Sequence, residues 1–374
     1  NAGTEISYTF AVDMSKVAKI MTGKAAKAYV AACLLVFAVS LCLLVYQGRK
    51  GVQAEEASDL SAETTAGQEN YLQYDASLEE NTLLMQLPEG VTQQDIELQS
   101  DCMAEKVTIR LRKEVGGKQL DRRYFQEHPI RQNISLAESE VKEEQDAVLF
   151  TVVLNQPQEA SVHLQRETAG TEAEITLQSP ASLYDKIVVL DAGHGGNDVG
   201  ETVVEQDVSL QEKDITLAAV QKAGELLLAQ GIRVYYTRED DSSRSPEERV
   251  GFANALQADM LISVHVTSAE DTTVYGIRTE YNAQYFIPDF SSADLAYLLL
   301  TEVAESTNEK ALDIVPGQDD NVVIGEAVIP VAQLDIGFLS NRQERKLLQR
   351  NVYIEKVAQG ICNAVLLAYK EMEK

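Results

Sequence analysis

Residues 186–196 read KIVVLDAGHGG, and this stretch decides the fold of the second half of the chain. From Ile187 to Leu190 every residue is apolar, as is typical of a strand that is buried on both faces of a parallel sheet. The glycines that follow allow the chain to turn sharply where the strand ends. The stretch therefore predicts the first strand of an α/β domain.

Short apolar runs alternate with longer helical patterns from this point to the C-terminus. Further strands are expected at 232–236, 260–264 and 328–336, and helices at 212–230, 246–256, 292–307 and 351–371. This alternation predicts an α/β fold with a mostly parallel sheet and helices on both of its faces. We assign residues 185–374 to this domain.

Residues 81–180 follow a different pattern. Apolar and polar residues alternate with a period of two in runs such as KVTIRLR (106–112) and AVLFTVVLN (147–155), which is the pattern of half-buried strands. The region is therefore predicted to be a small, β-rich, sandwich-like domain. The acidic and polar stretch before it, residues 49–80, is predicted to be a flexible linker.

The N-terminal 50 residues differ in charge from the rest, since they carry +4 whereas the whole chain carries −27. Residues 28–48 read AYVAACLLVFAVSLCLLVYQG and contain no charged side chain. At 1.5 Å per residue such a helix spans roughly 30 Å, the thickness of a bilayer core. We predict a transmembrane helix here, with a buried core helix as the alternative.

The basic residues before this run favour a cytoplasmic tail at 1–27, with the remainder of the chain outside the cell membrane. The small residues near Ala54 leave open a second possibility, cleavage as a signal peptide and secretion. The acidic balance argues against nucleic acid as a partner, because phosphate binding needs a basic face. Four cysteines without a CxxC pair favour neither a disulfide scaffold nor a zinc ribbon.

Four ionisable residues are expected near one edge of the predicted sheet. His194, His265 and Asp335 each lie at or just beyond the carboxyl end of a predicted strand, where ligands bind in open α/β sheets. Glu212 begins the first helix and can bring a carboxylate to the same edge. Two histidines and one glutamate, with a fourth position left to water, are a catalytic zinc set.

The alternative for His194 is a glycine-rich structural turn with a surface histidine. Other chemistries are disfavoured by the motifs around it. The turn lacks the last glycine of a dinucleotide fingerprint, and no GK[ST] follows it. Neither HExxH nor GxSxG occurs in the chain.

Residues from about Lys186 to Tyr369 resemble the zinc-dependent N-acetylmuramoyl-L-alanine amidases that cut bacterial peptidoglycan. The matching segments are IVVLDAGHGG (187–196), EKD (212–214), TR (237–238), ER (248–249), AN (253–254), SVH (263–265) and DIGFLSN (335–341) with Glu344. The resemblance implies that His194, Glu212 and His265 bind Zn²⁺. It also implies peptidoglycan as the substrate, cleaved between the lactyl group of N-acetylmuramic acid and L-alanine.

The sequence departs from the family pattern at two site positions. Asp335 stands where the family has its catalytic glutamate, and Thr267 stands where it has an asparagine. By the resemblance, Asp335 is the catalytic residue, and Thr267 and Asn341 are expected to contact substrate. The loop between Gly196 and Glu212 is longer than usual and is expected to be reshaped.

Two functions therefore follow from the sequence. The first is an active amidase in which Asp335 is the general base and then the general acid. The second is a catalytically silent wall-binding or regulatory protein, because the two departures occur together. A different zinc-dependent amide hydrolysis is a third and less favoured possibility.

Overall fold

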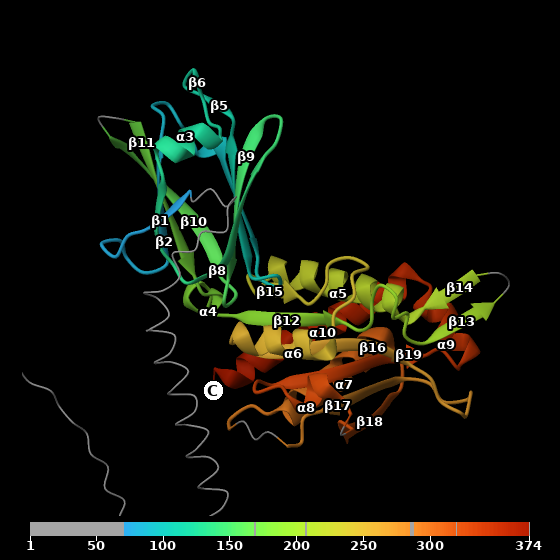
Figure 1. Cartoon of the computed structure of the whole chain (residues 1–374). Coiled ribbons are helices and arrows are strands. Elements are labelled where there is room, and N and C mark those ends of the chain that lie inside the picture. Colours follow the sequence, from blue (N-terminus) through green and yellow to red (C-terminus); the bar gives the residue numbers. More distant parts are fainter. Residues whose placement is uncertain (1–70, 168–169, 206–207, 285–287, 319, 374) are drawn as a thin grey trace, which may run out of the picture. The chain divides into compact units, whose positions relative to one another are not determined.

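The computed structural model describes residues 71–167, 170–205, 208–284, 288–318 and 320–373 (Figure 1). The predicted cytoplasmic tail, the transmembrane helix at 28–48 and most of the linker lie outside these residues. Within the described part, no helix combines the length and apolar character needed to cross a bilayer.

Two sheets form the strand-rich region. One has the order β1 (Leu72–Tyr74), β7 (Ile130–Asn133), β2 (Thr82–Leu87), β11 (Gly170–Gln178) and β10 (Glu159–Glu167). The other has the order β3 (Ile96–Asp101), β4 (Lys106–Arg112), β9 (Ala147–Leu154) and β8 (Leu136–Glu143). The short elements η1 (Gln93–Asp95), β5 (Glu114–Val115), β6 (Lys118–Gln119) and α3 (Arg122–Glu127) complete the region.

The period-two pattern of the sequence accounts for the core of this region. Val107, Ile109 and Leu111 of β4 are buried, and the residues between them are partly exposed. They join side chains of both sheets in one apolar cluster. Phe125 of α3 belongs to the cluster too and packs edge-on against Phe150 of β9.

A six-stranded sheet forms the centre of the α/β domain. Its order is β15 (Arg233–Tyr236), β12 (Ile187–Ala192), β16 (Met260–Thr267), β19 (Val331–Phe338), β17 (Ile277–Tyr281) and β18 (Ala311–Pro316). The first four are parallel to one another, whereas β17 runs antiparallel to β19 and parallel to β18. The prediction of a mostly parallel sheet is confirmed.

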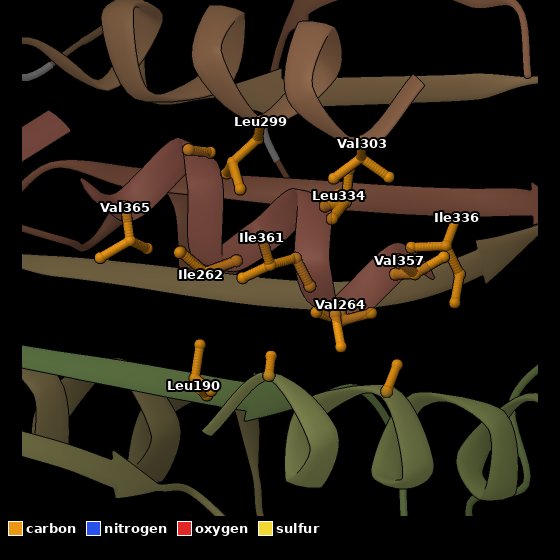
Figure 2. Packing of buried hydrophobic residues seen from close by; sticks show 14 of the residues in the cluster. Leu190, Ile262, Val264, Leu299, Val303, Leu334, Ile336, Val357, Ile361 and Val365 are labelled. Atoms are coloured by element: carbon orange, nitrogen blue, oxygen red, sulfur yellow. The ribbon is translucent and has the colours of Figure 1, made fainter. Parts of the chain in front are cut away.

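Helices cover both faces of this sheet, as predicted. The larger core packs α5 (Glu212–Ala229), α7 (Ser292–Thr307) and α10 (Asn351–Met372) against one face. Figure 2 shows Leu299 and Val303 of α7 and Ile361 of α10 among the strand residues of this core. The opposite face contacts α6 (Pro246–Ala255) and α8 (Val322–Gly325) through a smaller cluster. In the described part of the chain, the remaining helices are α4 (Pro180–Leu183) and α9 (Arg342–Leu348).

Local sequence signals set the beginnings of two helices. Ser245 caps α6 and forms a capping box with Glu248, and Pro246 occupies the first turn. Ser291 forms a second capping box with Asp294 at the beginning of α7. Each box satisfies backbone N–H groups that have no partner inside the helix.

The segment between Gly196 and Glu212 is an antiparallel hairpin of β13 (Thr202–Glu205) and β14 (Val208–Gln211). Val203 and Leu210 pack against the larger core, while Val204 is 72% exposed. The base of the hairpin is closed by a bond from the Glu212 N–H to the Glu201 carbonyl at 2.9 Å. The hairpin therefore fixes where α5 begins.

The face of the sheet that contacts α6 and α8 changes from apolar to polar along the strands. Near the beginning of the strands it presents apolar residues such as Val189, Leu261 and Val331. Two and four residues further on, the same face presents polar residues, because side chains alternate between faces. These polar residues are Asp191, Ser263, His265, Gln333 and Asp335.

Candidate metal centre

The turn after β12 presents His194 at the edge of the sheet. His194 adopts a left-handed backbone with φ of +64°, and Gly196 adopts one with φ of +60°. Two arginines donate hydrogen bonds to backbone carbonyls of this turn. Arg249 donates to the His194 carbonyl at 2.6 Å, and Arg238 donates to the Gly193 carbonyl at 2.9 Å. These bonds offset the strain of a left-handed histidine.

His194, Glu212 and His265 converge from three different elements. One donor atom of each lies within 4.8 Å of the others. His194 Nε2 is 3.1 Å from Glu212 Oε2, and His265 Nδ1 is 3.0 Å from Glu212 Oε1. The structure therefore brings together the three residues that the sequence predicted as ligands.

The Glu212 carboxylate is the buried member of the group, with 2% of its side chain exposed. It accepts backbone N–H bonds from Val266 and Glu201, both at 2.8 Å. Burial alone would raise the pKa of Glu212, but the two histidines hold that pKa well below its usual value. Glu212 is thus ionised and fixed in place at neutral pH.

Asp198 was not identified from the sequence, yet it orients the first histidine. Its carboxylate lies 2.9 Å from His194 Nδ1, which leaves Nε2 pointing toward Glu212. Partial burial alone would lower the pKa of His194, but the carboxylates of Glu212 and Asp198 raise it. A carboxylate behind a histidine ligand is the usual means of fixing its tautomer and ring orientation.

The donor set fits a zinc ion. Two imidazole nitrogens and one carboxylate oxygen are borderline ligands of the kind found in catalytic zinc sites. The two imidazoles are 24% and 21% exposed, so one side of the cluster opens to solvent. Glycines confine the other sides, because a Cβ on Gly193 would lie 2.4 Å from the His265 ring and one on Gly200 2.5 Å from Glu212 Oε2.

We expect Gly200→Ala to weaken zinc binding by about tenfold or more, since the added methyl must displace Glu212 or His194. Gly231→Ala is the matched control. Gly231 has a similar φ of +77° against +65°, but its Cβ would meet nothing within 4 Å. In both variants the free energy of unfolding should fall by about 1–2 kcal/mol, because the added Cβ strains a left-handed backbone. Competition titration with a zinc-binding dye measures the difference, and equal zinc affinities would contradict the prediction.

Asp335 lies next to the second histidine. His265 and Asp335 are register partners on the parallel strands β16 and β19, and Arg278 of β17 is the register partner of Asp335 on the other side. Only 1% of the Asp335 side chain is exposed. Its Oδ2 accepts from Arg278 and its Oδ1 accepts from Gln333 at 3.0 Å. Both carboxylate oxygens are therefore fixed.

The two residues expected to contact substrate are placed differently. Thr267 ends β16 and is half-buried, and its carbonyl accepts from the Leu339 N–H at 2.7 Å. Asn341 caps α9, accepting from the N–H groups of Gln343 and Glu344, and donates to the Thr272 carbonyl at 3.1 Å. The amide of Asn341 is thus engaged within the protein, so its contacts favour a structural role.

Further residues that support the site were missed from the sequence or were given no role there. Asp191 is 1% exposed and pairs with Arg249, while Ser263 and Thr237 also donate to it. Burial raises the pKa of Asp191, but Arg249 and the two hydroxyls lower it below its usual value. The sequence does contain a signal for Asp191, since it lies at the end of a strand that is otherwise fully apolar. A charge buried in this way needs a partner.

Comparison with known proteins agrees with this site. The sequence model of a family described as N-acetylmuramoyl-L-alanine amidase matches residues 188–366. The chain is 30% identical to the uncharacterized protein YqiI of Bacillus subtilis, over 50% of this chain and 87% of that protein. It is also 30% identical to the germination-specific N-acetylmuramoyl-L-alanine amidase of Bacillus subtilis, over 50% of this chain and 82% of that protein.

Among solved structures, the catalytic domain of the amidase CwlV from Bacillus (Paenibacillus) polymyxa var. colistinus is 29% identical. The match covers 50% of this chain and 98% of that domain, with a TM-score of 0.45. The two Bacillus subtilis relatives are each matched over most of their length, and the family model extends across the sheet and all three converging residues. The chain therefore belongs to the N-acetylmuramoyl-L-alanine amidase family.

Proposed function

We propose that the protein is an active zinc-dependent amidase of peptidoglycan, which hydrolyses the amide between the lactyl group of N-acetylmuramic acid and L-alanine. The observation that carries the proposal is the convergence of His194, Glu212 and His265, with Asp335 in register beside His265. A metal centre and a carboxylate at one edge of a sheet are the two parts that amide hydrolysis needs.

His194, Glu212 and His265 would hold the ion. When bound, zinc polarises a carbonyl and lowers the pKa of water to about 7. Asp198 keeps His194 in the ligating tautomer, and the backbone N–H groups of Val266 and Glu201 hold the Glu212 carboxylate in place. Asp335 accepts the proton of the attacking water and passes it to the leaving amine.

The fixed position of Asp335 supports activity over the silent alternative. Its carboxylate is one methylene shorter than the family's glutamate, but Arg278 and Gln333 hold both of its oxygens. A shorter carboxylate loses little catalytic rate if its neighbours hold it in the orientation that proton transfer requires. The substitution is therefore accommodated by surrounding side chains that fit aspartate.

The proposal is tested by incubating the zinc-loaded protein with muropeptides and following release of stem peptide by mass spectrometry. Asp335→Asn should lower turnover by about 10²- to 10⁴-fold, the usual contribution of a general base, while bound zinc stays unchanged. Absence of release by the native protein with zinc bound would reject the proposal.

Asp335→Glu distinguishes the active amidase from the silent protein, because it is expected to change turnover in opposite directions in the two cases. An extra methylene in a fully buried site must push the carboxylate against Arg278 or His265, so we expect turnover to fall. A silent protein that lacks only the family's glutamate would instead gain activity. The measurement is the same muropeptide assay, with zinc content determined in parallel.

We also propose that the α/β domain acts outside the cell membrane, tethered by residues 28–48. The support is the basic N-terminal segment, the uncharged run after it and the location of peptidoglycan. Protease treatment of intact cells whose wall has been removed tests this placement, because an extracytoplasmic domain would be digested and a cytoplasmic one protected.

A further inference from the structure

Arg278 lies at the same edge of the sheet as the metal-binding residues. It is the register partner of Asp335, which is in turn the register partner of His265. Residues paired in register on neighbouring strands present their side chains on the same face. The three side chains therefore form a row across β16, β19 and β17, with the arginine at one end.

The contacts of the guanidinium leave one of its nitrogens without a protein partner. Nε donates to Asp335 Oδ2 at 2.9 Å, and Nη2 donates to Glu280 Oε1 at 3.2 Å. Nη2 also forms an ion pair with Asp335 Oδ2, at 2.7 Å. Nη1 donates no hydrogen bond to the residues that the structure describes. Arg278 thus has donor capacity beyond what holds Asp335.

Arg278 is more exposed than the two carboxylates that it contacts. Its side chain is 32% exposed, compared with 9% for Glu280 and 1% for Asp335. Burial and the neighbouring Asp335 raise the pKa of Glu280, while Arg278 itself lowers it. In a chain with a net charge of −27, an exposed cation beside the reacting groups is a local attractor for an anion.

We propose that Arg278 is a substrate-binding residue that holds a carboxylate of the stem peptide beside the amide to be cleaved. This inference rests on the proposed function. The carboxylate nearest to that amide on the leaving side is the α-carboxylate of the residue after L-alanine. Nη1 donates to this group while Nε and Nη2 keep Asp335 in place, so one guanidinium aligns the substrate with the general base.

The test uses two muropeptides that differ only in the second stem residue, whose α-carboxyl group is either free or amidated. The measured quantity is the ratio of kcat/KM for the two substrates. The native protein should prefer the free carboxylate by about 10- to 100-fold, the effect expected of a hydrogen bond to a charged group. Arg278→Met should abolish this preference, and Arg278→Lys should keep part of it.

The ratio remains valid if a variant is partly unfolded, because both substrates meet the same preparation. Gln333→Met is the matched control, since Gln333 holds the other oxygen of Asp335. It should slow both substrates equally and leave the ratio unchanged.

Three outcomes would overturn the inference. Equal cleavage of both substrates by the native protein would overturn it and leave the proposed function intact. An equal loss on both substrates in Arg278→Met would assign Arg278 to the positioning of Asp335 alone. Cleavage of neither substrate by the zinc-loaded native protein would reject the function and this inference together.

Discussion

Replacing His194 or His265 by alanine will abolish stoichiometric zinc binding and lower amidase turnover by about 10³-fold or more. The reason is that each imidazole supplies one of three converging ligands, and metal activation of water and carbonyl contributes several kcal/mol to such a reaction. The fold should persist, because both imidazoles lie at the edge of the sheet and are more than one-fifth exposed. Atomic absorption measures the zinc content of each variant, and circular dichroism shows whether the fold persists.

His163→Ala is the control for the histidine variants. His163 lies in β10, is exposed and is not part of the converging cluster. It should keep both zinc and turnover. Normal zinc content in His194→Ala would show that the cluster does not bind metal through this residue.

Arg249→Met will destabilise the α/β domain by about 3–5 kcal/mol, the usual effect of leaving a buried charge without its partner. Arg249 and Asp191 are 6% and 1% exposed, and their ion pair measures 2.6 Å. Arg249 also donates to the carbonyls of Ala192 and His194. The variant should therefore weaken zinc binding as well, because the turn that presents His194 loses its support.

Lys222→Met is the matched control for this prediction. Lys222 pairs with Glu225 at 2.8 Å, but the two side chains are 47% and 65% exposed. Exposed pairs of this kind contribute little to stability, so the unfolding transition should not move. Urea denaturation followed by circular dichroism compares the variants. Equal midpoints for Arg249→Met and the native protein would show that the buried pair is dispensable.

The sequence was sufficient to predict the strands that bring the candidate ligands together. The apolar runs before His194 and His265 mark strands buried on both faces, and parallel strands place their carboxyl ends at one edge. The expected helix at 292–307 has those same bounds in the structure. Residue type and position suggested the ligand set, and the resemblance to the amidase family assigned it.

Several elements of the α/β domain were not predicted, and β17 and the β13–β14 hairpin show the physical reason. β17 reads IRTEY, and its Arg278 and Glu280 interrupt any apolar pattern. Their charges are accommodated by Asp335 and Asn321, which come from distant parts of the chain. The β13–β14 hairpin is short, and of its described side chains Val203 and Leu210 pack against the core. Partners supplied by tertiary structure leave no signal in a local pattern.

The order of strands in the central sheet has a consequence for how the candidate metal site forms during folding. β16 and β19 are neighbours in space, yet β17, α7, β18 and α8 lie between them along the chain. The candidate ligands and Asp335 therefore meet only after long stretches of chain have closed into loops, which costs conformational entropy. Burial of apolar side chains in the larger core offsets this cost. An unfolded chain offers zinc no preformed site, so an ion bound by His194, Glu212 and His265 would stabilise the folded state by mass action. If zinc binds as proposed, chelation should empty the site without unfolding the domain, because the apolar core does not depend on the ion.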